Sequence, residues 1–242
     1  MPSSKQTISA LAMTAIASVN AAMGPAFSTG PVASDSFIRE STSTLVLPKA
    51  PSGSSGDASL WVGMGTSNGD LIQSIADNWQ SSSWSIFAYT LLSTSGMWIP
   101  LPSIVDCFAD LPQATTQMPV QGDSSTANAG DKVTMHYKFD DSTGNYTQTV
   151  LVNGETVSTL STSDGRAQGW GSAVECAEDN CGTMPAHSWI DTKIILDTAD
   201  ANYINTLGKG EGVTGDMTTS DNGKTWTVST ISIPEFTFGS SS

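Results

Sequence analysis

The sequence predicts an all-β protein, a β-sandwich of two curved antiparallel sheets with little helix. Charged residues make up only 13% of the 242-residue chain, which is low for a helical protein with many surface Glu and Lys side chains. Short apolar runs alternate with Gly, Asn, Asp and Ser turn signals, as in proteins built from many strands. A single sandwich domain commonly reaches this length.

The N-terminal 21 residues have the layout of a secretory signal peptide. Lys5 supplies a basic start, residues 8–19 are mostly small and apolar, and Val19-Asn20-Ala21 offers a cleavage site. We therefore expect secretion, or residence in the secretory pathway. No other stretch reaches the roughly 18 apolar residues of a membrane span. We expect residues 22–57 to be a flexible segment with one candidate strand at 42–47, and residues 58–242 to form the sandwich.

Turn signals place the strands of this domain in order. A hairpin joins residues 59–63 to 71–76 through Asn68-Gly69, and a longer strand follows at 84–92. The prolines of residues 97–119 predict a loop. The remaining expected elements are a three-stranded meander at 132–139, 147–152 and 156–161, a short helix at 199–207, and strands at 188–196 and within 224–238.

Charge and motif content exclude several classes of function. The formal net charge of −14 repels phosphate backbones, so nucleic acid is not an expected partner. Neither His136 nor His187 lies in a zinc-ligand spacing, and there is no phosphate-binding loop or nucleophile-elbow motif. We expect no metal and no cofactor.

Two covalent features fit an oxidising compartment. Cys176 and Cys181 enclose a four-residue loop that a disulfide could close, which would leave Cys107 as the odd thiol. Asn145 begins the sequon Asn-Tyr-Thr in a turn-like segment and is the candidate glycosylation site. The acidic residues Glu175 and Glu178 beside this loop are expected to face solvent.

Seven tryptophans are the main candidates for a ligand-binding surface. A buried tryptophan is as a rule part of a core, but alternation along a strand groups some of them with polar side chains. The groups are Trp61 with Gly63, Gln73 with Leu71 and Ile75, Trp84 with Ile86 and Ala88, and Trp189 with His187 and Asp191. The presence of Gln73 and His187 in these groups indicates one face open to a ligand.

Four short motifs resemble, in order, those of the fungal glutamic peptidases, or eqolisins. They are Ala58-Ser-Leu-Trp-Val-Gly63, Leu71-Ile-Gln-Ser74, Asn128-Ala-Gly-Asp-Lys-Val133 and Ser188-Trp-Ile190. The resemblance covers about residues 57–236 and implies a sandwich related to the concanavalin-type fold. It implies that Gln73 occupies the position of the family's catalytic Gln, which works with a Glu to activate water.

The resemblance also implies that the catalytic Glu is missing. In the family this Glu precedes a Trp, and the matching residue here is Ser188, before Trp189. A serine hydroxyl is essentially never ionised near neutral pH, so it cannot serve as the general base. Peptide hydrolysis by that mechanism is therefore not expected. Residues 84–89 also lack the family's acidic residues on a neighbouring strand, which suits an apolar ligand.

A secreted sandwich without this dyad resembles a second fungal group, the hetero-Diels-Alderases of tropolone-sesquiterpene biosynthesis. The resemblance implies that a tropolone-type quinone methide adds to a macrocyclic sesquiterpene alkene of the humulene type, without a cofactor. Both substrates are small and apolar, and positioning them would be the main task of the protein. The expected residues are Gln73, His187 and Tyr89 as polarising groups, and Trp61, Trp84, Ile86, Ser188, Trp189 and Trp170 as substrate contacts.

Two alternatives stay open at this point. One is a binding module, either lectin-like or a carrier of small apolar molecules. The other is a glutamic-peptidase-like hydrolase that uses a different carboxylate, such as Asp191, in place of the missing Glu.

Overall fold

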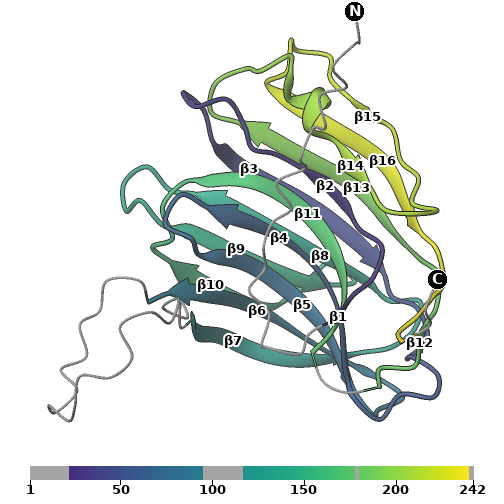
Figure 1. The fold of residues 1–242 in the computed structure, drawn as a ribbon. Helices are drawn as coiled ribbons and strands as arrows, with labels where there is room; N and C mark the ends of the chain where they lie inside the picture. Colours follow the sequence, from purple (N-terminus) through teal and green to yellow (C-terminus); the bar gives the residue numbers. More distant parts are fainter. Residues whose placement is uncertain (1–21, 95–116, 178–179, 240–242) are drawn as a thin grey trace, which may run out of the picture.

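The computed structural model describes residues 22–94, 117–177 and 180–239 (Figure 1). Within these residues the regular structure is almost entirely strand, and the one helical turn is the 3-10 segment η1 (Tyr203–Thr206). The predicted all-β class with little helix is therefore confirmed. The short helix expected at 199–207 is reduced to this single turn.

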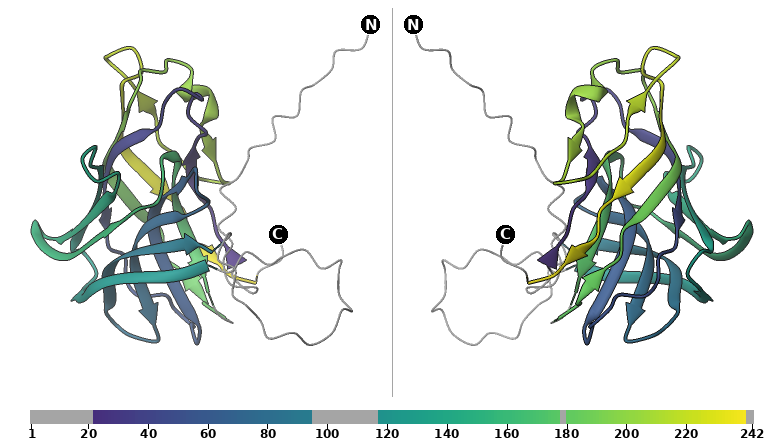
Figure 2. Two further views of the ribbon diagram at one scale, coloured as in Figure 1. Left: turned by 90° about the vertical axis from the view of Figure 1, so that its left-hand side faces the viewer. Right: turned by 90° about the vertical axis from the view of Figure 1, so that its right-hand side faces the viewer.

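The strands pair continuously, but they form two layers that face each other (Figure 2). The first layer has the order β10 (Glu155–Thr162), β9 (Tyr146–Val152), β8 (Lys132–Phe139), β3 (Ile38–Val46), β13 (His187–Leu196), β16 (Thr225–Ile233) and β15 (Met217–Thr218). The second has the order β11 (Ala167–Cys176), β4 (Asp57–Thr66), β5 (Leu71–Trp79), β6 (Trp84–Ser93) and β7 (Gln117–Ala127).

Shorter strands complete the edges. The free edge of β11 pairs with β1 (Ala22–Met23) and β2 (Phe27–Thr29), and β14 (Gly208–Lys209) pairs with β2. Strand pairing between the two layers is limited, among the described residues, to Ala167 of β11 and Ile38 of β3. A separate ribbon is formed by β12 (Thr183–Met184) and β17 (Phe236–Thr237).

The core lies between the layers and takes the even-numbered side chains of β4, β5 and β6. Tyr137 of the first layer donates a hydrogen bond to the Val62 carbonyl at 2.5 Å and accepts one from the Ser74 amide at 2.7 Å. The Ser74 hydroxyl in turn donates to Gln148 of β9 at 3.0 Å. Because side chains alternate along a strand, the odd-numbered residues of these strands point away from the first layer.

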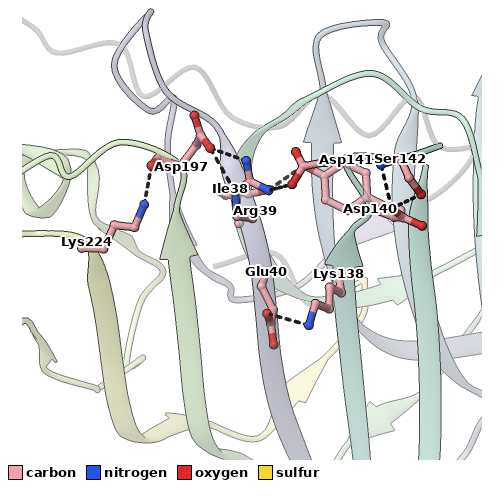
Figure 3. A network of polar contacts seen from close by, with 10 residues as sticks. Ile38, Arg39, Glu40, Lys138, Asp140, Asp141, Ser142, Asp197 and Lys224 are labelled. Atoms are coloured by element: carbon pink, nitrogen blue, oxygen red, sulfur yellow. Dashed lines mark hydrogen bonds and ion pairs between the residues drawn. The ribbon is translucent and has the colours of Figure 1, made fainter. Parts of the chain in front are cut away.

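The first layer is locked at one end by a charged network around Arg39 (Figure 3). Its guanidinium donates to Asp197 at 2.5 and 3.0 Å and to Asp141 in the β8–β9 turn at 2.7 Å. Lys224 donates to the Asp197 carbonyl. Arg39 lies on β3, so the network ties a central strand to the turn that joins β8 and β9.

The hairpin and the meander predicted from the turn signals are confirmed, and the hairpin strands are longer than expected. Two predictions are wrong. Residues 22–57 were expected to be flexible apart from one candidate strand at 42–47. That strand is present as β3, which pairs with β8 and β13 at the centre of the first layer, but β1 and β2 precede it, so the segment is more ordered than expected. The loop expected at 97–119 does not extend to its end, because β7 begins at Gln117; residues 97–116 lie outside the described residues.

Candidate functional site

The outward face of β11, β4, β5 and β6 carries a second apolar cluster, separate from the core. We call this surface the site face. Its buried members are Trp61, Leu71, Ile75, Phe87 and Ala173, with Tyr89 and Leu91 packed against them. An apolar cluster on the face of a sheet that points away from the core is a candidate ligand-binding surface.

Strand register arranges the site face in three rows. The middle row is apolar and runs Ala173, Trp61, Ile75, Phe87 from β11 to β6. One neighbouring row runs Gly171, Gly63, Gln73, Tyr89, and the row on the other side runs Glu175, Ser59, Asp77, Ser85. The apolar row therefore separates an uncharged polar row from an acidic one.

Trp61 connects the two polar rows. Its indole Nε1 donates to Glu175 Oε2 at 2.6 Å. At the other end of the ring, a Cβ atom added at Gly63 would lie 3.3 Å from Trp61 Cζ3 and only 2.8 Å from the Ile72 carbonyl oxygen. The absence of a side chain at Gly63 thus leaves room for the indole ring of Trp61 beside it.

Gln73 is the buried polar group of the uncharged row. Its side chain is 4% exposed, and its amide oxygen has no hydrogen-bond partner among the described residues. Buried polar atoms are satisfied in the great majority of cases, so each exception needs an explanation. Tyr89, opposite Gln73 on β6, keeps part of its surface exposed. Burial of the Tyr89 phenol and the nearby charge of Glu175 both raise the pKa of Tyr89.

The acidic row holds two carboxyl groups, Asp77 and Glu175, whose pKa values lie above the usual range. Burial raises the pKa of Asp77, and a hydrogen bond to the Asp57 carboxyl and the charges of Asp57 and Glu175 raise it further. Burial also raises the pKa of Glu175, against the opposing effect of the hydrogen bond from Trp61. A carboxyl group of this kind can donate a proton in mildly acidic or neutral solution.

The structure brings together three of the predicted site residues and separates the others. Gln73, Tyr89 and Trp61 share the site face. In contrast, the substrate contacts predicted at Trp84, Ile86, Trp170 and Trp189 are wrong, because these side chains lie in the core between the layers. Trp84 Nε1, for example, donates to the Pro48 carbonyl at 3.0 Å. Period-two alternation grouped Trp84 with Ile86 and Trp189 with His187 correctly, but it does not tell which face of a sheet is covered. Asp191, also grouped with Trp189, is instead exposed, because the alternation of β13 changes phase where its pairing with β3 shifts register.

His187 and Ser188 belong to β13 in the opposite layer. His187 is buried, its Nδ1 lies 3.0 Å from the Pro185 carbonyl oxygen, and burial lowers its pKa to about 4. Ser188 points to the outer side of the first layer, since its neighbour Trp189 points into the core. Ser188, which was predicted as a substrate contact, is therefore not on the site face. The residues aligned with Gln73 across β4 and β11 are Gly63 and Gly171.

The prediction that Glu175 faces solvent is also wrong. It lies on the site face, hydrogen-bonded to Trp61; Glu178 is outside the described residues. The sequence signal was the spacing of Gly171, Ala173 and Glu175, which would have put the acid on one face had residues 167–176 been recognised as a strand. Their glycines and small side chains hid it. Asp191, the other carboxylate considered, is exposed on β13 and remote from Gln73.

The disulfide between Cys176 and Cys181 is confirmed, with Cα atoms 5.6 Å apart. It closes the loop directly after Glu175 and so fixes the end of β11. Cys107 lies outside the described residues. Across the described part of the chain there is no cluster of three or more His, Cys, Asp or Glu suited to a metal ion. The same residues contain no helix long and apolar enough to cross a membrane.

No protein-family model and no curated protein matches this sequence. Among solved structures, the chain is similar to scytalido-glutamic peptidase in complex with a peptide-based transition state analogue, at 15% identity over 86% of this chain and 97% of that one, with a TM-score of 0.47. SCP-B, a member of the eqolisin family of peptidases in complex with the tripeptide Ala-Ile-His, matches at 14% identity over 86% and 96% of the two chains, TM-score 0.46.

A legume lectin-like domain from Entamoeba histolytica matches at 11% identity over 90% of this chain and 80% of that one, with a TM-score of 0.34. Two of these three structures are glutamic peptidases, the group that the short sequence motifs resemble. At such identities the likeness concerns the fold, and function has to rest on the residues of this chain.

Proposed function

We propose that the protein is a cofactor-free enzyme of the secretory pathway that joins two small apolar molecules on the site face by a hetero-Diels-Alder reaction. The single observation that carries the proposal is the unpartnered amide oxygen of Gln73 within an apolar cluster outside the core. A neutral ligand with an apolar framework and one or two hydrogen-bonding oxygens complements such a surface. An anionic ligand would lose its hydration without gaining a counter-ion there, since the charged row of the site face is acidic.

The acidic row supplies the proton transfer that such a reaction needs. In a hydroxymethyl tropolone-type precursor, the carboxyl of Glu175 or Asp77 protonates the departing hydroxyl, and the C–O bond breaks to release water. The ring hydroxyl then returns a proton to the carboxylate. The net change is loss of one water and formation of the quinone methide. The raised pKa values of Asp77 and Glu175 keep the acid form available for this step.

The uncharged row supplies the second step. The Gln73 amide oxygen accepts a hydrogen bond from the ring hydroxyl of the precursor. The Tyr89 hydroxyl or the Gln73 amide nitrogen donates one to the oxygen of the heterodiene, while Trp61 and Phe87 hold the alkene of the terpene beside it. The cycloaddition forms one C–C and one C–O bond and transfers no electrons to an external acceptor. Holding both partners in contact converts a bimolecular step into an effectively unimolecular one.

The experiment is to incubate the full chain with a hydroxymethyl tropolone-type precursor and humulene and to analyse products by chiral chromatography. We expect one enantiomer, formed faster than in buffer. The matched variants are Gln73→Leu, on the site face, and Thr230→Leu, at an exposed position of β16 in the first layer. We expect only Gln73→Leu to lose stereoselectivity. A racemic product formed at the rate in buffer would overturn the proposal. Saturable binding of the substrates without turnover would also overturn it and would indicate a carrier of small apolar molecules.

A second candidate, acid-dependent peptide hydrolysis, is favoured by the presence of Gln73 and Glu175 on the same face. Glu175 is four residues along β11 from Gly171, the residue aligned with Gln73, which is about 13 Å of strand. The two groups are therefore too far apart to hold one water between them. Digestion of a denatured protein at mildly acidic pH, abolished by both Gln73→Leu and Glu175→Gln, would favour hydrolysis over cyclisation.

A further inference from the structure

The outer side of the first layer carries a hollow that belongs neither to the core nor to the site face. Its volume is about 580 Å³, in the range of small-ligand sites. Its lining includes His136, Lys138, Phe139, Asp141, Thr147 and Thr149. Hydroxyl, ammonium and carboxylate groups beside an aromatic ring offer the donors, acceptors and apolar surface that a saccharide needs.

The candidate acceptor for a saccharide lies at the rim of this hollow. Asn145 directly precedes β9, and alternation puts its side chain on the same face as Thr147 and Thr149, both of which line the hollow. Its Nδ2 donates to the Ser161 hydroxyl at 3.4 Å, an exposed contact that attachment of a sugar would replace. Thr147 is both the third residue of the sequon and part of the lining.

The turn that presents Asn145 is held rigidly. The Asp140 amide donates to the Asn145 carbonyl at 2.9 Å, and the amide and hydroxyl of Ser142 donate to Asp140 at 2.8 and 2.7 Å. Asp141 is anchored by Arg39 at 2.7 Å (Figure 3). A sugar attached to Asn145 would therefore start from a well-defined point on the turn. From Asn145 to Thr149 is four residues, or about 13 Å of strand, a span that the first few sugars of an N-linked glycan can follow.

We propose that Asn145 carries an N-linked glycan whose first sugars lie in the hollow over the outer face of β8, β9 and the turn that joins them. The inference is independent of the reaction at the site face, because the two surfaces lie on opposite outer sides of the sandwich. It requires passage through the secretory pathway. Charge does not oppose it, since the neutral sugars of the glycan core need no counter-ion.

The test is secretion of the full chain from a host that performs N-glycosylation, followed by peptide mass spectrometry. Wild type and Thr147→Ser, which keeps the sequon, should carry a glycan at Asn145. Asn145→Gln and Thr147→Val, which preserves the shape of the lining side chain, should not. Secreted wild-type protein with unmodified Asn145 would overturn the proposal.

Docking into the hollow is tested separately by reductive methylation of lysines. Lys138 and Lys132 are both exposed and lie on the same face of β8, six residues apart, so only Lys138 borders the hollow. We expect methylation of Lys138 to be several-fold slower in the glycosylated protein than in Asn145→Gln and Thr147→Val, with Lys132 unchanged. Equal Lys138 rates in glycosylated and unglycosylated proteins would show that the glycan extends into solvent, and would overturn the docking.

Discussion

At the scale of single residues, Trp61 determines how the site face works. One edge of its indole bonds the carboxylate of Glu175, and the other lies over Gly63 beside Gln73. The ring thus donates the hydrogen bond that lowers the pKa of Glu175, and in the proposed reaction it also forms one wall of the ligand site. Alternation in the sequence was enough to put Trp61 and Gln73 among the candidates. The acid was missed, because the glycines and small side chains of its strand hide the β pattern.

Replacing Trp61 by Phe should raise the pKa of Glu175. The lost hydrogen bond favoured the ionised carboxylate, so its removal leaves burial to act without that opposition. A carbon-detected NMR titration of the glutamate carboxyls measures the change. Trp79→Phe is the control, because Trp79 is 51% exposed at the end of β5. A Glu175 titration that stays unchanged in Trp61→Phe would show that the hydrogen bond does not control this acid.

Gly63→Ala should displace the indole ring of Trp61, which packs against Gly63. The new methyl group would come within 2.8 Å of the Ile72 carbonyl and 3.3 Å of the Trp61 ring. We expect a loss of about 1–3 kcal/mol in the free energy of unfolding, as for other overpacked sites, together with loss of product stereoselectivity. Denaturant unfolding and chiral product analysis check the two effects. Wild-type stability and selectivity in the variant would contradict the packing argument.

At the scale of elements, the sandwich is held by side chains that cross from one layer into the backbone of the other. Tyr137 is the clearest case, since its hydroxyl bonds both β4 and β5. The hairpins on either side of such contacts could be predicted, because Asn-Gly turns identify them: Asn153 and Gly154 both have positive φ, at 52° and 90°. The contact between layers could not be predicted, because it depends on which faces meet.

Tyr137→Phe should cost about 1–3 kcal/mol in the free energy of unfolding, because the buried Ser74 amide would lose its partner. Urea unfolding measures the change. The same substitution at Tyr89 is the matched control, since the Tyr89 hydroxyl makes no hydrogen bond to a described residue, and should cost less than about 0.5 kcal/mol. Equal losses in the two variants would indicate that the cross-layer hydrogen bonds add little.

At the scale of the whole molecule, the buried carboxyls make stability depend on pH. Burial raises the pKa values of Asp70, Asp77, Asp164 and Glu175, that of Asp164 to about 6. A carboxyl whose pKa is higher in the folded state stabilises the fold below its unfolded pKa of about 4, and this contribution is lost as pH rises through the folded value. His187 acts oppositely: its folded pKa of about 4 favours the fold above about pH 6.5 and less so as pH falls.

The free energy of unfolding should therefore decline between mildly acidic and neutral pH. Asp164→Asn should reduce that decline and raise stability at pH 7 by on the order of 1–2 kcal/mol, since it removes a buried charge while an amide oxygen can still accept from Thr162. Asp191→Asn, at an exposed position of β13, serves as the control. Chemical denaturation across this pH range is the measurement. A wild-type profile that rises towards neutrality would contradict the assignment.

The position of β3 has a consequence for the order in which the chain can fold. This strand lies near the start of the chain, yet its two neighbours are β8 and β13, and the neighbour beyond β13 is β16, which ends at Ile233. The layer cannot close while the ribosome still holds the last strands. Pairings this distant in sequence slow folding. Until β13 and β16 have been made, β8 is the only neighbour in the layer with which β3 can pair, and the edge that β13 later covers stays unpaired.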